Sequence, residues 1–309
     1  MNKRTLTYIW LLTFILLFLI PTVLKNLYII HLMNGVMIYI SLTLAFSILA
    51  KTGQVSIGQA AFFGAGAYAA AIVNKYIGFN PLLEFIFAAF ICLIFSLIIG
   101  SITLRLKGIY FSIATLSFAQ TLLVIANMER KILGGATGIS VRPFFNNNIY
   151  YNYYFSIILC LVILIASYII NNLKLGYASV VIRNDERLAR SIGINPVKYK
   201  ILAFLISAVL TGIIGSYYIH YVTFIIPDEI FSTNISVSIL AMAIFGGINT
   251  VEGPFLGAFI LKIIEELLRL NIKYGHLIIY GLILIISILY IPEGIINVKY
   301  FSLKKKRRQ

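Results

Sequence analysis

The sequence predicts an all-α integral membrane protein of about ten transmembrane helices. Of its 309 residues, 61% are hydrophobic and 11% are charged, which is about half the charged fraction usual in soluble domains. A globular fold cannot hide so much apolar surface from water, because the ratio of surface to volume limits burial. Since one crossing of a bilayer takes about 20 apolar residues, about ten crossings with short loops nearly fill the chain.

Ten apolar segments mark the expected helices. They cover residues 8–24, 27–50, 56–73, 82–104, 109–126, 151–170, 201–222, 235–245, 254–270 and 277–291. The first resembles a secretory signal, but Pro21 stands where a small-residue cleavage site would be, so we expect a retained helix. The third and eighth are short, and the ninth carries charge. We expect these three to be short or broken helices near glycine-rich turns, facing the protein interior.

Lysine and arginine set the expected orientation, because loops rich in these residues stay in the cytoplasm. With all ten segments crossing, the cytoplasm receives most of them: Lys3, Arg4, Lys51, Arg105, Lys107, the loop 174–200 and the tail 304–308. The outside receives Lys25, Lys75, Arg130, Lys131, Arg142 and Lys273. Both termini are therefore expected in the cytoplasm. The net charge of +15 reflects this topology and contact with lipid, and we expect no binding to nucleic acid.

The chain divides into three expected parts. Residues 1–27 form the first helix and N-terminal anchor, and residues 299–309 form a basic cytoplasmic tail. Residues 28–298 form the transmembrane domain, with its one substantial cytoplasmic loop at 174–200.

Residue patterns that would indicate an enzyme are missing. His31, His220 and His276 are scattered singly near helix ends, where we expect interfacial positions and not metal ligation. The sequence contains no Gly-x4-Gly-Lys-Ser/Thr phosphate loop. Cys92 and Cys160 lie in separate apolar segments and suggest no disulfide. We expect no catalytic residue, no metal site and no cofactor bound by this chain.

Two glycine-rich stretches, 52–68 and 245–258, each join a helix running inward to one running outward. In the first, Ala61, Ala65 and Ala69 recur at every fourth position, a pattern that lets helix backbones touch within lipid. Close packing and the lining of a translocation path are both open interpretations. The candidate path residues are Gly53, Gln54, Ser56, Gly58, Gln59, Gly64, Tyr68, Thr115, Gly246, Gly247 and Asn249.

The ninth segment carries charge inside an apolar stretch. Lys262, Glu265, Glu266 and Arg269 are spaced three and four residues apart, so opposite charges can pair along one helix face. Charge within a membrane is often functional, but long side chains near a helix end can reach water. We favour a structural belt of ion pairs over a substrate site.

The loop between the sixth and seventh segments predicts a short capped helix. Asn184 is the expected N-cap. Asp185 and Glu186 stand in the first turn, as the helix dipole favours, and Gly193 suits the left-handed position that ends a helix. These signals place the helix at residues 184–193.

One face of this helix is apolar. Leu188 and Ile192 are four residues apart, with Ala189 beside them, while Arg187 and Arg190 point elsewhere. A helix of this kind either lies on a membrane or docks into a groove of another protein. Its apolar area is small for membrane binding alone, so we favour docking.

At these residues the sequence resembles the permease subunits of branched-chain amino acid ABC importers, especially the LivM type. The resemblance covers residues 28–296 and is carried by the stretches 52–68, 110–116, 134–139, 183–195, 245–258 and 291–294. The family's coupling loop reads Glu-x-Ala-Ala-x-x-x-Gly. Glu186, Ala189 and Gly193 match it, and Leu188 replaces the first alanine.

The resemblance implies a multi-pass protein of the prokaryotic cell membrane that works in a complex. Its partners would be two ABC ATP-binding subunits that hold ATP and Mg, a second permease of the LivH type and an extracytoplasmic substrate-binding protein. The expected cargo is a branched-chain, hydrophobic amino acid. Urea or a short amide is the alternative cargo, and a stand-alone ion-coupled transporter is the alternative mechanism.

Overall fold

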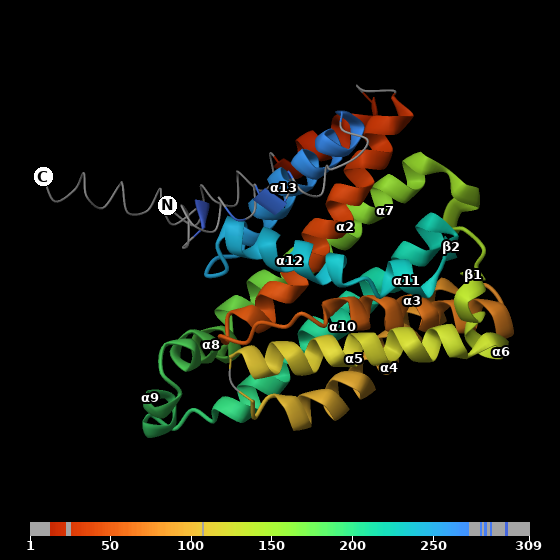
Figure 1. The fold of residues 1–309 in the computed structure, drawn as a ribbon. Helices are drawn as coiled ribbons and strands as arrows, with labels where there is room; N and C mark the ends of the chain where they lie inside the picture. The colour runs from red at the N-terminus through yellow and green to blue at the C-terminus, as the bar shows by residue number, and fades with distance from the viewer. Residues whose placement is uncertain are drawn as a thin grey trace, which may run out of the picture.

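The computed structural model describes residues 13–22, 26–106, 108–271, 279, 281–282, 285 and 294–295. Within them the chain is built almost wholly from helices (Figure 1). Among the described helices, six are long and apolar enough to cross a membrane: α2 (Leu27–Ala50), α4 (Pro81–Thr103), α5 (Ile109–Met128), α7 (Ile149–Asn172), α10 (Pro196–Val222) and the stretch Pro227–Gly246. The prediction of a helical membrane protein is confirmed.

Further helices coincide with the remaining predicted segments. A short apolar helix, Thr13–Thr22, lies in the first of them, α3 (Gln59–Tyr76) in the third and α13 (Glu252–Asn271) in the ninth. The stretch Pro227–Gly246 consists of α11 (Pro227–Ile230) and α12 (Thr233–Gly246). Most of the tenth predicted segment and the tail at 299–309 lie outside the described residues.

Short elements connect these helices. They are α6 (Arg130–Leu133), η1 (Gly135–Thr137), β1 (Ile139–Ser140), η2 (Phe144–Asn147), α8 (Lys174–Asn184), α9 (Glu186–Ser191) and β2 (Phe224–Ile225). β1 and β2 form an antiparallel ladder in which Ile139 pairs with Ile225. The all-helical prediction did not include this ladder, because two residues per strand are too few for an alternating pattern in the sequence.

Asparagine side chains begin several of the long helices. Asn80, Asn148 and Asn195 each accept hydrogen bonds from backbone N–H groups in the first turns of α4, α7 and α10. Proline follows directly at the start of α4 and α10, where its missing N–H has no intrahelical partner to lose. These caps satisfy donors that would otherwise be exposed at the ends of the apolar helices.

α3 lies at the centre of the bundle, packed against α10 and α4 and touching α5 and α12 (Figure 1). Every residue from Gln59 to Ala71 is buried. The prediction that the third segment faces the protein interior is therefore confirmed. α13 packs between α2 and α12, and α7 packs on α2.

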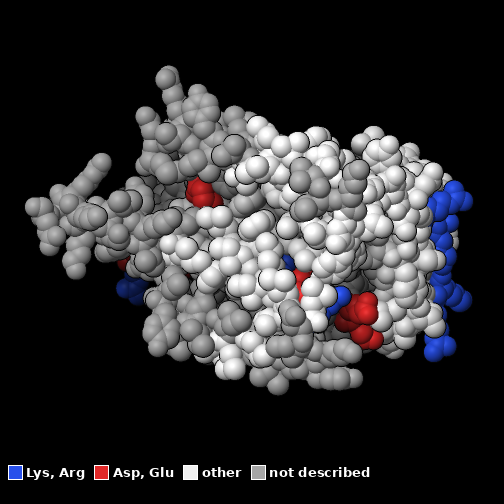
Figure 2. Space-filling view, turned by 90° about the horizontal axis from the view of Figure 1, so that it is seen from above, with Lys and Arg blue, Asp and Glu red and all other residues white. Residues whose placement is uncertain are grey.

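Polar and basic residues lie at both ends of the bundle. At one end, which we call the β1–β2 end, Lys75 donates to the carbonyl of Lys131, and Asn74 accepts from the backbone N–H of Arg142. At the other, the α9 end, α8 and α9 project beyond the long helices (Figure 1). Figure 2 shows basic side chains gathered along one edge, with acidic side chains nearby.

A buried acid–histidine pair lies at the β1–β2 end. The Nε2 atom of His220 and the Oε2 atom of Glu84 are in direct contact, and both side chains are fully buried. His220 also contacts the carbonyl of Arg142 at 2.8 Å through Nδ1 and stacks on Phe144 at 3.9 Å between ring centroids. His220 lies two residues before the end of α10, as the expected position near a helix end requires, but the loop after α6 folds over it and shields it from the surroundings.

Candidate coupling helix and translocation path

The predicted helix in the cytoplasmic loop is present as α9. Its N-cap is Asp185, whose Oδ1 accepts from the N–H groups of Arg187 and Leu188 at 2.7 and 3.4 Å. The prediction of Asn184 as the cap is wrong by one residue, because Asn184 ends α8 and the chain turns only at Asp185. Gly193 has φ +81°, which confirms its predicted left-handed conformation.

The apolar face of α9 has two exposed residues. Leu188 is 55% exposed and Ile192 59% exposed, a large fraction for branched aliphatic side chains at a polar end of the molecule. Ala189 was expected beside them, but it is fully buried against Ala178 and Ile182 of α8. Ala189 therefore joins α9 to α8, and only Leu188 and Ile192 remain available to a partner.

A shallow hollow of about 400 Å³ lies at the C-terminal end of α9, lined by Arg190 and residues 193–197. Two exposed aliphatic side chains and a hollow on one short helix and the turn after it form a surface suited to docking against another protein.

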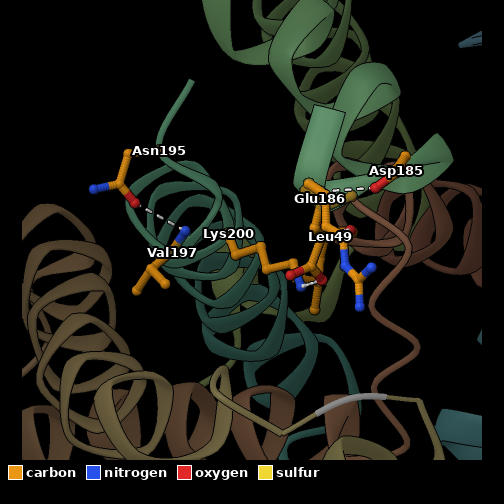
Figure 3. A network of polar contacts seen from close by, with 8 residues as sticks. Leu49, Asp185, Glu186, Asn195, Val197 and Lys200 are labelled. Carbon is orange, nitrogen blue, oxygen red and sulfur yellow. Dashed lines mark hydrogen bonds and ion pairs between the residues drawn. The ribbon is translucent and has the colours of Figure 1, made fainter. Parts of the chain in front are cut away.

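An ion pair fastens α9 to the start of α10. Lys200 Nζ lies 2.5 Å from Glu186 Oε1, and their side chains point toward each other between the two helices (Figure 3). The Lys200 side chain is 5% exposed and that of Glu186 25% exposed. Glu186 was expected to contact a partner, whereas in this structure it holds α9 in place.

Removing Glu186 should therefore loosen α9. We expect Glu186→Ala to lower the free energy of unfolding by on the order of 1–3 kcal/mol, because it leaves the Lys200 ammonium buried without its partner. The double variant Glu186→Gln with Lys200→Met should recover most of this loss, since no unpaired charge remains. Thermal unfolding of the purified chain in detergent measures both, and equal losses in the two variants would contradict the pairing.

The first glycine-rich stretch is a packing surface. A Cβ atom on Gly58 would lie 2.3 Å from the carbonyl oxygen of Thr115, and one on Gly66 would lie 2.1 Å from that of Gly212. At Gly64 it would meet the Phe231 ring at 2.3 Å, beside the point where Tyr68 stacks on that ring. Of the two open interpretations, the structure supports close packing of α3 for these glycines.

The polar residues of this stretch bind neighbouring helices. The Gln59 amide donates to the hydroxyls of Ser207 and Thr211 on α10, at 3.0 and 2.8 Å. The Thr115 hydroxyl accepts from the N–H of Ile57 at 3.2 Å. Ser56, whose hydroxyl accepts from the N–H of Gly58 at 3.2 Å, is fully buried. Irregular backbone between α2 and α3 is thus satisfied inside the protein.

Gln54 and the second glycine-rich stretch are also enclosed. Gln54 is 2% exposed. A Cβ on Gly246 would lie 1.8 Å from the carbonyl oxygen of Gly253, so α12 and α13 touch backbone to backbone. Gly247 ends α12 with φ +104°.

Two of the candidate path residues meet at the α9 end. Arg183, at the end of α8, donates to the side-chain oxygen of Asn249, and its side chain lies against Gly53. Lys51 is nearby in sequence and donates to Asn171 at 2.9 Å. Burial lowers the pKa of Lys51 to about 8, although the carboxylate of Glu252 acts in the opposite direction. Arg183 thus links the helix before α9 to both glycine-rich turns.

Sequence reasoning did not identify Arg183 or Lys200 as contacts, because their partners are 66 and 14 residues away. It did identify the belt on α13. Lys262 pairs with Glu265 and Glu266 at 3.2 Å each, and Arg269 lies 3.7 Å from Glu266. Lys262 also lies over the ring of Tyr39 on α2, 4.2 Å from its centroid. These contacts confirm the expected ion pairs.

Among the described residues, no group of three or more His, Cys, Asp or Glu side chains is placed to hold a metal ion. Fold and site together define a multi-pass helical membrane protein with a short helix, α9, that exposes two aliphatic side chains outside the candidate spans. The chain belongs to the branched-chain amino acid transport system permease component family, whose model matches residues 28–288. It is a transport permease and not an enzyme.

Two named permeases and one solved structure are similar to this chain. The high-affinity branched-chain amino acid transport system permease protein LivM of Salmonella typhimurium is 28% identical, over 88% of this chain and 71% of that protein. A probable LivH permease protein of Methanocaldococcus jannaschii is 25% identical, over 87% and 90%. The solved structure of PsaBC from Streptococcus pneumoniae in complex with Fab aligns with a TM-score of 0.49 at 15% identity, over 93% and 98%.

Proposed function

We propose that this chain is a transmembrane subunit of an ATP-driven importer that carries branched-chain, hydrophobic amino acids across a prokaryotic cell membrane. The observation that carries the proposal is α9. This helix lies outside the six candidate spans, exposes Leu188 and Ile192, and is followed by a hollow at its C-terminal end. In a member of this family, such a surface suits an ATP-binding subunit. ATP and Mg bind that subunit and not this chain.

The proposed complex contains two ATP-binding subunits, a second permease of the LivH type and an extracytoplasmic binding protein. The α9 end is cytoplasmic, both termini lie on that side and all ten predicted segments cross. Two features favour this topology. Loops rich in lysine and arginine stay in the cytoplasm, and the α8–α9 loop is rich in both. Lys75, Lys131 and Arg142 lie at the opposite end of the bundle, which would then be the outer end.

The contacts of α9 with α8 and α10 provide a route by which ATP binding could be coupled to transport. Closure of the ATP-binding dimer displaces α9, and the ion pair to Lys200 transmits this displacement to α10. α8 transmits it to Gly53 and Asn249 through Arg183. ATP can shift the permease between its two conformations only by as much as the ATP-bound partner differs in binding free energy for those conformations.

Reconstitution tests this function directly. In proteoliposomes that contain the whole complex, uptake of labelled leucine should require internal ATP and the external binding protein, and excess isoleucine or valine should compete with it. Excess urea or acetamide should leave uptake unchanged. Uptake by this chain alone, driven by an ion gradient, would overturn the proposal.

The link through Arg183 makes a separate prediction. Arg183→Ala and Asn249→Ala should each reduce ATP-driven uptake by roughly 10- to 150-fold, because a hydrogen bond to a charged group contributes about 1.5–3 kcal/mol. The double variant should lose no more than either single variant, since both remove the same contact. Additive losses in leucine uptake would show that the two residues act independently.

A further inference from the structure

α5 carries a stripe of exposed side chains at helical spacing. Its exposed residues lie along one side of the helix and are Ile109, Tyr110, Ile113, Ser117, Gln120, Thr121, Val124, Ile125 and Met128. The centre of this stripe is polar. Gln120 lies eight residues before the end of α5, or about 12 Å at the helical rise of 1.5 Å per residue, close to the middle of the span.

Two other spans provide an internal comparison. The exposed residues in the middle of α4 are Ile86, Phe90, Leu93, Leu97 and Ile98, and those of α7 are Ile158, Val162 and Ile165. These faces are uniformly apolar, as contact with hydrocarbon requires. The exposed residues in the middle of α5 are instead Ser117, Gln120 and Thr121. The Thr121 hydroxyl donates to the carbonyl of Ser117 at 2.9 Å, but the Gln120 amide has two N–H donors and a carbonyl acceptor, for which hydrocarbon offers no partner. We therefore expect protein or water beside Gln120.

The polar character continues along the seam where α5 meets α11 and the start of α12. The Gln120 amide donates to the hydroxyl of Thr233 at 3.1 Å. Nearer the β1–β2 end, the Asn127 amide lies 3.5 Å from the carboxylate of Asp228. Both contacts are solvent-exposed. A track of hydroxyl, amide and carboxylate groups thus runs from the middle of the span to the surface of the molecule.

We propose that this seam, made of Ser117, Gln120, Thr121, Asn127, Asp228 and Thr233, lines a water-filled half of the translocation path and faces the second permease. The inference rests on the proposed function. It places this half of the path along α5 and not along the glycine-rich stretches, where close contacts with neighbouring helices leave no open space. The amide and hydroxyl groups suit the ammonium and carboxylate of an amino acid zwitterion, and Val124 and Ile113 provide apolar surface for its side chain.

Cysteine accessibility in the assembled complex tests the seam. Ser117→Cys, Gln120→Cys, Thr121→Cys and Asn127→Cys are compared with Phe90→Cys and Val162→Cys on the apolar faces. The probe is a membrane-impermeant methanethiosulfonate ammonium reagent, added from the side of the β1–β2 end. Cys92 and Cys160 are fully buried, so the unaltered chain supplies the background.

We expect the seam variants to react at least about tenfold faster than the apolar-face variants, because only a thiol in water forms the reactive thiolate. Asn127→Cys should react fastest and Ser117→Cys slowest, following depth. Leucine and the binding protein should slow the reaction in the presence of ATP.

Reaction of Ser117→Cys and Gln120→Cys no faster than Phe90→Cys, with and without ATP, would overturn the proposal. Disulfide cross-linking of those two variants to the second permease without labelling from water would also overturn it, because the seam would then be a dry interface. Rapid labelling that urea slows and leucine does not would uphold the seam and refute the proposed substrate.

Discussion

Replacing both Leu188 and Ile192 with aspartate should abolish ATP-driven uptake. Docking of α9 would then require two carboxylates to leave water for an apolar groove, at a cost of several kcal/mol each, while the apolar burial of two aliphatic side chains is lost. A loss of about 4 kcal/mol already weakens association about 1,000-fold. Co-purification of the ATP-binding subunits and substrate-stimulated ATP hydrolysis measure the effect.

The change is confined to α9. Both side chains are more than half exposed, so the double variant should insert and elute as the unaltered permease does. The matched control is Leu188→Met with Ile192→Met, which keeps an apolar side chain of similar volume at each position and should retain most coupled uptake. Full coupling in the aspartate variant would exclude this face as the docking surface.

Local signals in the sequence predicted α9 well. Asp185, Glu186 and Gly193 lie within one short segment, and each acts through its own backbone or the nearest turn. The one-residue error in the cap arose because Asn184 and Asp185 are equally good N-caps. The choice between them depends on where α8 ends, which is decided by the packing of Ile182 and Ala189.

Features that depend on distant contacts were not predictable in this way. Small residues at every fourth position indicate close approach of helices, but the pattern does not say whether the neighbour is a helix of the same chain or an open path. In the structure, Gly58 and Gly64 face Thr115 and Phe231. The pairing of Glu84 with His220 joins residues 136 positions apart, and single occurrences of each carry no periodic signal.

The polar residues in the middle of α5 are visible as a pattern in the sequence. Ser117, Gln120 and Thr121 follow helical spacing within an apolar segment. Only the structure establishes that this face is turned outward while those of α4 and α7 at the same depth are apolar. A sequence pattern gives the face of a helix, and tertiary packing decides what that face meets.

The packing of α3 against α10 leads to the second large prediction, that Gly66→Ala will destabilise the permease severely. The new methyl group would lie 2.1 Å from the carbonyl oxygen of Gly212 and 2.5 Å from its Cα, and a carbonyl oxygen fixed in a helix cannot turn aside as a side chain does. The two helices must separate, which costs on the order of 2–3 kcal/mol for an overpacked core. Van der Waals packing of close helix backbones drives helix association in lipid. Separating α3 from α10 at Gly66 therefore also weakens their packing at neighbouring positions.

Gly35 on α2 is the matched control. A Cβ at Gly35 meets nothing within 4 Å, so Gly35→Ala should gain up to about 1 kcal/mol from the better helix propensity of alanine. The same chemical change is thus expected to have opposite signs at two helical glycines of one chain. Thermal unfolding in detergent should show a midpoint lower by on the order of 3–5 °C for Gly66→Ala and unchanged or slightly higher for Gly35→Ala. Equal midpoints for the two variants would mean that α3 and α10 are not in backbone contact in the folded permease.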